Sequence, residues 1–255
     1  MPDRLCTTRI EAGGIAVLAI AGCETEPRQR LLEGVKRHFH SLAANDAVKG
    51  IVVTGSSLGF CRSSSDHSAS PAEAAGLSAF GQKVMFSIEQ CGKPVVAAVD
   101  GDCAGVGFEL ALACSFIVAS DTSRFGFPAI ADGLIPFCGG TQRLARLVGT
   151  SKAKEIIFSG DMLTAAEALR VRLVNRLFAA QELVLLAVGL LERICRNSPR
   201  ALRVGGEVVD AGYAIDLPTA CLLERNAFAL CFSSADQREG MQAFLDKRQP
   251  QFTGE

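Results

Sequence analysis

The chain has 255 residues, of which 49% are hydrophobic and 21% charged, with a formal net charge of −1. This length suits one large domain, or one domain and a smaller appendage. The charge balance excludes a general attraction to nucleic acid or to anionic membranes. The ten cysteines include no C-x-x-C pair, which favours reduced thiols because a chain of this size needs no disulfides.

The first residues, "MPDRLCTTRIEAGG", carry charges and no apolar stretch, so they do not indicate a signal peptide. No apolar run reaches the roughly 18 residues that a membrane-spanning helix requires. We therefore expect a cytoplasmic protein with no membrane partner.

Apolar runs alternate with helical patterns through the first half of the chain. Strands are expected at 15–22, 49–57, 93–105 and 114–120, and helices at 28–45 and near 74–90, with a serine-rich loop at 61–73. Strands that alternate with helices predict an α/β fold whose sheet is largely parallel and buried.

From about residue 139 the pattern becomes almost wholly helical. The segment 164–174 starts with a capping box, in which Thr164 is followed three residues later by Glu167. Helical periodicity continues through 180–197, 216–232 and 236–247. The sequence thus predicts an α/β core over residues 1–195 and a helical C-terminal region over 196–255.

The stretch "GDCAGVGFELALAC", residues 101–114, places Glu109 among apolar neighbours. Gly105 and Gly107 let the backbone turn and approach a ligand closely. The pattern lacks the third glycine and the later acidic residue of a dinucleotide-binding fingerprint. Two interpretations of Glu109 stay open: it caps the first turn of its own helix, or it is a working carboxylate.

Four stretches resemble the enoyl-CoA hydratase/isomerase (crotonase) family in the same order along the chain. They are 93–120, "RFGFPAIADGLIPFCGGTQRLARLVG" at 124–149, "SGDMLTAAEALRVRLVNRL" at 159–177 and "DQREGMQAFLDKRQPQF" at 236–252. The resemblance implies a crotonase-like spiral of ββα repeats with a helical C-terminal trimerisation region. It also implies a coenzyme A thioester as substrate, with no cofactor and no metal, and an enolate held by two backbone N–H groups.

The resemblance assigns two positions in the glycine turn and its helix. Glu109 falls on the first catalytic glutamate of the family, and the N–H of Val106 is one donor of the oxyanion hole. Apolar neighbours are expected to raise the pKa of Glu109, which suits a group that exchanges protons near neutral pH.

The second oxyanion donor falls in the serine-rich loop, where the register stays open by one residue. Counting from Phe60 assigns the N–H of Ser64, and counting back from Asp66 assigns that of Ser65. Of the two we take Ser64. His67 lies close by and is interpreted as an exposed loop residue, although some family members use a histidine here.

Two positions depart from the family pattern. Hydratases carry a second glutamate after the proline of the F-G-x-P motif, and this chain has Ala129 there. Phe137 replaces a glycine in the I-P-G stretch that follows, and its ring is expected to fill space beside the acyl group.

The C-terminal motif supplies candidate coenzyme A contacts. Phe244, Lys247 and Arg248 match positions that in relatives hold the adenine and phosphates, often of a neighbouring subunit. The alternative is an ordinary helix end with cations at its C-terminus. Apolar residues such as Phe228 and Phe232 favour self-association as a trimer or a dimer of trimers.

These observations predict an acyl-CoA-processing enzyme, nominally an enoyl-CoA hydratase that lacks one of the two usual glutamates. An isomerase or a decarboxylase is the first alternative, because either needs only the oxyanion hole and one proton relay. A catalytically weak acyl-CoA-binding homologue is the second. The acyl chain, the pathway and the choice between coenzyme A and a carrier protein stay open.

Overall fold

The computed structural model describes residues 5–21, 27–56, 59–62 and 70–255. The main sheet has six strands in the order β1-β2-β3-β5-β7-β10. Its strands are β1 (Cys6–Ile10), β2 (Ile15–Ile20), β3 (Gly50–Thr54), β5 (Val95–Val99), β7 (Phe116–Ser120) and β10 (Arg176–Phe178). All neighbours pair in parallel except β1, which pairs antiparallel with β2 at one edge. The predicted parallel sheet is therefore confirmed.

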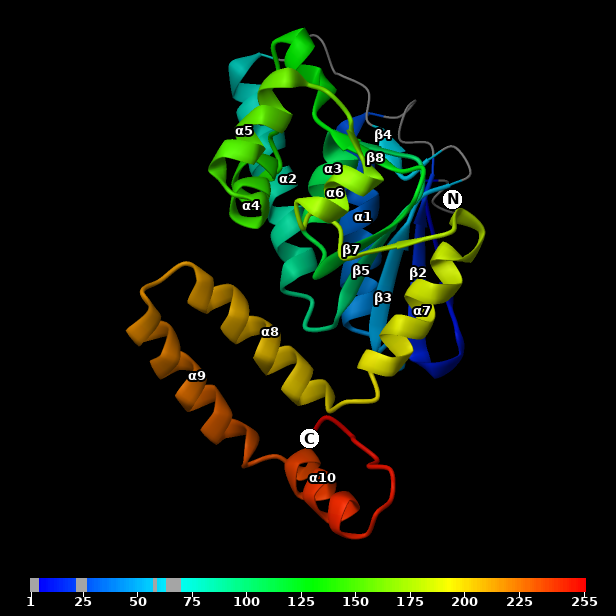
Figure 1. Cartoon of the computed structure of the whole chain (residues 1–255), viewed down its shortest axis with the longest axis vertical. Coiled ribbons are helices and arrows are strands. Elements are labelled where there is room, and N and C mark those ends of the chain that lie inside the picture. Colours follow the sequence, from blue (N-terminus) through cyan, green and yellow to red (C-terminus); the bar gives the residue numbers. More distant parts are fainter. Residues whose placement is uncertain (1–4, 22–26, 57–58, 63–69) are drawn as a thin grey trace.

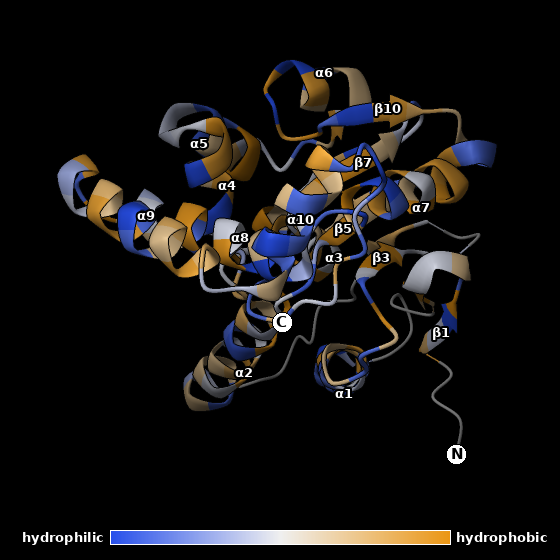
Figure 2. Ribbon diagram, turned by 90° about the horizontal axis from the view of Figure 1, so that it is seen from below, coloured by the Kyte–Doolittle hydropathy of each residue, from blue (hydrophilic) through white to orange (hydrophobic). Residues whose placement is uncertain are grey.

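Alternate residues of the central strands pack into two different layers. Val17, Val52 and Val96 face the helix α7 (Leu183–Ile194). Leu18 and Val53, one residue further along, face the opposite layer. The strands are apolar on both faces because both faces are covered, and Figure 2 shows α7 on one side of the sheet with α1 and α2 on the other.

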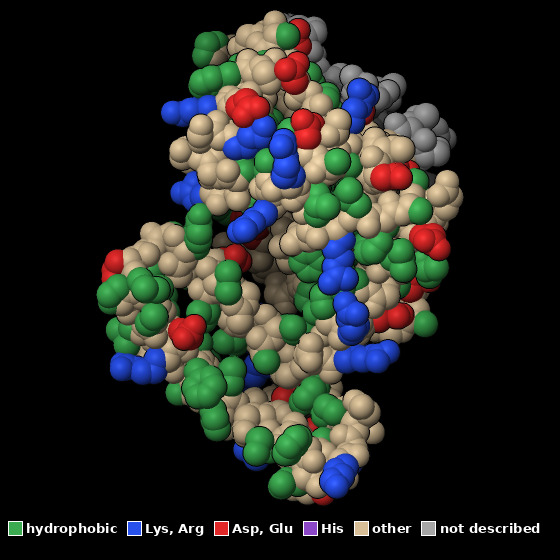
Figure 3. Space-filling model, viewed as in Figure 1, with side chains coloured by type: hydrophobic (Ala, Val, Ile, Leu, Met, Phe, Trp, Pro, Cys, Tyr) green, Lys and Arg blue, Asp and Glu red, His purple; other side chains and the backbone are tan. Residues whose placement is uncertain are grey.

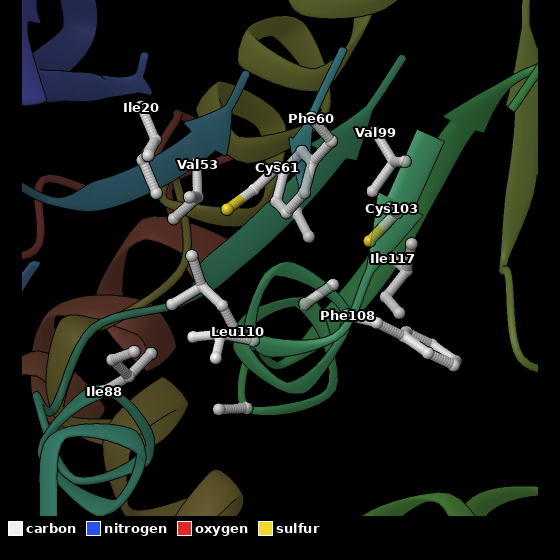
Figure 4. Close-up of a cluster of buried hydrophobic side chains, with 14 of the residues drawn as sticks. Ile20, Val53, Phe60, Cys61, Ile88, Val99, Cys103, Phe108, Leu110 and Ile117 are labelled. Carbon is white, nitrogen blue, oxygen red and sulfur yellow. The ribbon is translucent and has the colours of Figure 1, made fainter. Parts of the chain in front are cut away.

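The opposite layer contains α1 (Arg28–Ala43), α2 (Pro71–Glu89) and the short α3 (Val106–Leu112). Phe108 and Leu110 of α3 point into the cluster that this layer forms with the strands (Figure 4). The next helices along the chain are α4 (Gly140–Val148), α5 (Thr150–Ser159) and α6 (Ala165–Arg170). Thr164 and Glu167 form the predicted capping box at the start of α6.

A second, smaller sheet positions α3. It has the order β4-β6-β8-β9, formed by β4 (Cys61–Arg62), β6 (Asp102–Ala104), β8 (Arg124–Gly126) and β9 (Leu163–Thr164). Gly107 of α3 lies so close to β4 that a Cβ on it would be 2.3 Å from the carbonyl oxygen of Cys61. Within the described residues, short 3-10 turns lie at Ala12–Gly14, Pro128–Asp132 and Ala180–Glu182.

The last helices, α8 (Pro199–Tyr213), α9 (Leu217–Cys231) and α10 (Ala235–Leu245), extend away from the sheet as an arm (Figure 1). The arm carries exposed apolar side chains, among them Leu217, Phe228 and Phe244, at 74%, 65% and 77% exposure. Figure 3 shows hydrophobic side chains along its surface. None of the helices in the described part of the chain is long and apolar enough to cross a membrane.

The region after residue 139 is almost wholly helical, as expected, and the sequence pattern did not reveal its two short strands, β9 and β10, which add a strand to each sheet. Strands of two and three residues are too short to show an alternating pattern. The periodicity also missed α8, whose start is marked by Ser198 as N-cap and Pro199 as first residue.

Candidate active site

The candidate site starts at the glycine turn between β6 and α3. Gly105 is the N-cap of α3 and has φ 57° and ψ −126°, a conformation that side chains with a Cβ rarely adopt. Val106 follows as the first helical residue, and no positive φ is found there. Its valine side chain therefore fits the backbone, and its N–H lies in the first turn, where no intrahelical acceptor exists.

Glu109 lies one turn into α3 and is 1% exposed. Its Oε1 accepts two backbone hydrogen bonds, from the N–H of Cys138 at 2.6 Å and from the N–H of Gly140 at 2.8 Å. Its Oε2 is buried without a hydrogen-bond partner among the described residues. One carboxylate oxygen is thus fixed by hydrogen bonds, and the other can accept or release a proton.

The first interpretation of Glu109, as a cap on its own helix, is wrong. The two N–H groups that it binds belong to the segment leading into α4, 29 and 31 residues further along the chain. Glu109 therefore joins α3 to the N-terminus of α4, where the unpaired N–H groups and the helix dipole favour an anion.

Burial raises the pKa of Glu109 above its ordinary value, because desolvation disfavours the ionised form. The backbone N–H groups of Gly140, Cys138 and Phe137 oppose this shift, as does the positive charge of Arg143. Desolvation is the larger effect, so the predicted rise of this pKa is confirmed.

The turn that binds Glu109 is itself fastened to α2. The guanidinium of Arg143 donates to both oxygens of Glu89, at 2.6 and 2.8 Å, and to the carbonyl of Cys138 at 3.0 Å. A Cβ on Gly140 would lie 2.8 Å from Cγ of Glu109, so only glycine lets the turn approach this closely. Sequence reasoning missed these four positions, although the Gly-Gly pair at the start of α4 is the signal that could have indicated a turn there.

A small cavity of about 20 Å³ adjoins Glu109, which is room for about one water molecule. Val106, Ala129 and Phe137 also line it, so the structure brings these four sequence-selected positions together. The other lining residues are Arg28, Gly105, Phe127, Leu134, Ile135 and Pro136. The ring of Phe127 stacks on Phe108 at 4.8 Å and makes this wall apolar.

The remaining sequence-selected residues do not join this cluster. Phe244 and Lys247 lie at the end of the arm, at the opposite end of the molecule from α3 within one chain (Figure 1). Arg248 pairs with Glu239 at 2.6 Å. The serine-rich loop positions Ser64 and Ser65, together with His67, lie outside the described residues.

Comparison with known proteins finds similarity over most of the chain. The family model for enoyl-CoA hydratase/isomerase matches residues 28–255. A crotonyl-CoA hydratase of Syntrophomonas wolfei is 39% identical over 216 residues, which cover 82% of this chain and 83% of the relative. A short-chain-enoyl-CoA hydratase of Clostridium acetobutylicum is 42% identical over 168 residues, 66% of this chain and 64% of the relative.

A solved structure of an enoyl-CoA hydratase has the same fold. The crystal structure of an enoyl-CoA hydratase from Bacillus anthracis superposes with a TM-score of 0.93 at 28% sequence identity. The superposition covers 99% of this chain and 100% of that chain.

The raised pKa of Glu109 predicts a pH-dependent effect of Glu109→Gln on stability. An acid whose pKa is higher in the folded than in the unfolded state contributes stability below the unfolded pKa, near 4.5. That contribution is lost as the pH rises through the folded pKa. The glutamine is neutral at every pH. The melting temperature of the variant should therefore rise relative to that of wild type as the pH increases from about 4.5, and the difference should become constant above the folded pKa. A difference independent of pH would contradict the raised pKa.

Proposed function

Because the chain belongs to the enoyl-CoA hydratase/isomerase (crotonase) family, we propose that it hydrates an enoyl-CoA thioester with Glu109 as its one carboxylate acid and base. The resemblance and the crotonase-like fold expected from the sequence are confirmed, and the protein is an enzyme of the hydratase/isomerase type. The observation that carries the assignment of Glu109 is its buried carboxylate, with one oxygen clamped and the other unpartnered.

The thioester carbonyl is placed against the N–H of Val106 in this proposal. Addition to the double bond at C3 moves negative charge onto the thioester oxygen, and a fixed backbone donor stabilises that charge without reorganisation. Val106 lines the same cavity as Glu109, which supports this placement. The second donor is assigned to Ser64 on the sequence resemblance alone.

Glu109 carries one proton through the reaction. Its ionised carboxylate accepts a proton from water while the water oxygen forms a bond to C3. The electron pair of the double bond then moves to the thioester enolate. The proton held on Glu109 returns to C2, the enolate collapses to the saturated thioester, and the carboxylate is regenerated. A raised pKa favours this cycle, because the group must hold the proton between the two transfers.

The cavity has enough volume for a water molecule but not for the acyl group. Its volume of about 20 Å³ is far below the roughly 300 Å³ or more of ordinary ligand pockets. Leu134 and Ile135 are 37% and 65% exposed, so this part of the segment that leads to Phe137 lies at the surface. We infer that this segment moves outward when the thioester binds.

Ala129 supports double-bond isomerisation as a second candidate activity. Moving a proton from C2 to C4 of a β,γ-enoyl thioester needs one base, since the proton that leaves is the proton that returns. Ala129 lines the cavity beside Glu109 and transfers no proton. A site with one carboxylate is chemically complete for this reaction.

Coenzyme A is assigned as part of the substrate, and Phe244 and Lys247 are assigned to its adenine and phosphates in the site of a neighbouring subunit. Their distance from α3 within one chain (Figure 1) supports a role between subunits. The domain boundary proposed from the sequence, with a core over 1–195 and a helical region over 196–255, places the arm of α8, α9 and α10 in the second part.

Glu109→Gln is the direct test of the proposed chemistry. The amide keeps the shape and can accept the two N–H bonds, but it cannot carry a proton. The expected result is a loss of roughly 10²–10⁴ in kcat on crotonyl-CoA and on 3-butenoyl-CoA, with binding of a saturated acyl-CoA unchanged. The thioester that wild type turns over faster decides between hydration and isomerisation. Undiminished kcat in the variant, or no turnover by wild type, would refute the proposal.

Ala129→Glu combined with Phe137→Gly tests whether the scaffold supports two-carboxylate hydration. The glycine is needed because the ring of Phe137 lines the same small cavity and leaves no room for a new side chain. A gain of roughly tenfold in crotonyl-CoA hydration, about 1.4 kcal/mol in activation free energy, is expected of the double variant. Ala129→Glu alone serves as the control and should gain less. A folded double variant that binds acyl-CoA without any gain would argue for one-carboxylate chemistry.

The exposed apolar side chains of the arm predict a trimer or a dimer of trimers. Leu217, Phe228 and Phe244 present apolar area that a subunit contact would remove from water. Sedimentation equilibrium at micromolar concentration measures the mass directly. A stable monomer would also remove the basis for assigning Phe244 and Lys247 to a neighbour's site.

A further inference from the structure

One face of α2 lies against the turn at residues 137–140, whose backbone N–H groups bind the buried carboxylate. The hydroxyl of Ser78 donates to the carbonyl of Phe137 at 2.7 Å. Gly81 follows one turn later, and Glu89, which pairs with a guanidinium of α4, follows after two more turns. These positions form one stripe along the helix, so the turn is held against α2 on both sides of Gly81.

Gly81 leaves the space that the side chain of Cys138 fills. It lies in the middle of a 19-residue helix, where glycine is less favourable than alanine. A Cβ at this position would overlap the Sγ of Cys138, whereas it would lie 3.5 Å from the Cβ of the same residue. Cys138 is completely buried. The first atom that such a Cβ meets is therefore a sulfur atom, and removal of the sulfur removes the overlap.

Cys138 connects α2 with the carboxyl group of Glu109. Its sulfur lies over Gly81 of α2, and its N–H donates to Oε1 of Glu109 at 2.6 Å. Burial raises the pKa of the thiol, and the negative charge of Glu109 raises it further, so the side chain stays neutral. The reaction scheme proposed above gives this sulfur no role.

We infer that Cys138 is a positioning residue: its sulfur, placed over Gly81, holds the turn at the distance from α2 at which its N–H orients the carboxylate of Glu109. The inference rests on the proposed function, because it takes Glu109 as the proton-carrying group. Loss of this contact moves the reacting oxygen, and a misplacement of about 1 Å costs roughly 100-fold in rate. The N–H of Val106 belongs to a different turn, so binding of the thioester is not affected.

The test moves the filling atom from the turn to the helix. Gly81→Ala adds a methyl group that overlaps the sulfur, and Cys138→Ala removes the sulfur and leaves a gap. The double variant places the two Cβ atoms 3.5 Å apart, an ordinary van der Waals contact, and thus fills the gap from the other side. Gly76→Ala is the matched control, because Gly76 lies in the same helix with nothing within 4 Å of a Cβ, and alanine improves helix propensity at both positions.

The kinetic readout is turnover of crotonyl-CoA or 3-butenoyl-CoA, whichever wild type converts faster. Gly81→Ala should lower kcat roughly 10–100-fold and Cys138→Ala roughly tenfold, while KM stays within about threefold of wild type because ground-state binding is unchanged. The double variant should recover kcat to within about threefold of wild type, which two independent substitutions would not do. Gly76→Ala should match wild type.

A second readout does not depend on turnover. Burial raises the pKa of Glu109 and the N–H of Cys138 opposes this rise, so displacement of the turn in Gly81→Ala should raise that pKa further. The double variant should return it to the wild-type value. NMR titration of the glutamate carboxyl carbons, assigned by comparison with Glu109→Gln, measures it. The nearby cations, Arg28 of α1 and Arg143 of α4, are the same in every variant.

A folded Gly81→Ala variant with the kcat of Gly76→Ala would overturn the inference, as would a double variant no faster than Gly81→Ala. A change confined to KM would also contradict it and would assign the contact to binding of the acyl group. Where the melting curve shows that Gly81→Ala does not fold, Cys138→Ala must still be slow and the double variant must still recover. A wild type that turns over neither thioester refutes the proposed function. In that case the titration decides, and a pKa of Glu109 that is the same in Gly81→Ala as in wild type overturns the positioning by itself.

Discussion

The two backbone hydrogen bonds to Oε1 of Glu109 are the interaction on which the rest of the site depends. They come from Cys138 and Gly140 at the start of α4, so the position of the carboxylate is set by a turn that α3 does not contain. That turn is held in place by Arg143 and its ion pair with Glu89 at the end of α2. Three helices thus meet at one carboxyl group. The two donors to Oε1 are backbone N–H groups, which have no rotamers to lose, and the ion pair with Glu89 holds Arg143 in one orientation.

The clamp, formed by the N–H groups of Cys138 and Gly140 on Oε1 of Glu109 and by Arg143 on the carbonyl of Cys138, explains why a carboxyl group is tolerated in an apolar layer. Transfer of an unpaired carboxylate from water into such a layer costs several kcal/mol. The two N–H bonds and the α4 N-terminus offset part of that cost, while desolvation still raises the pKa of Glu109. A fully paired carboxylate would be a weak base, and an unpaired one would stay protonated. Pairing one oxygen and leaving the other unpartnered places the group between these limits, where it can both accept and release a proton.

The sequence was informative where local rules decide the structure. The β-branched runs located β2, β3, β5 and β7, and Thr164 with Glu167 located the start of α6. The clamp could not be predicted in the same way. Its donors are backbone N–H groups some 30 residues from Glu109, and a backbone N–H has no residue type that a pattern could reveal. Family resemblance selected Glu109, Val106 and Ala129, which the fold does bring together.

The residues around the cavity divide into two groups that answer to different constraints. The first group is the clamp around Glu109, and a change in it alters the position of the reacting carboxylate itself. The side chains of Phe137 and Arg28 also line the cavity and contact each other. A substitution of either side chain alters the space and charge beside Glu109 and leaves the backbone donors to its carboxylate in place. The ring of Phe137 reduces the volume of the cavity beside Glu109, and the same ring contacts the guanidinium of Arg28. The smaller cavity and the position of this positive charge therefore both depend on one side chain.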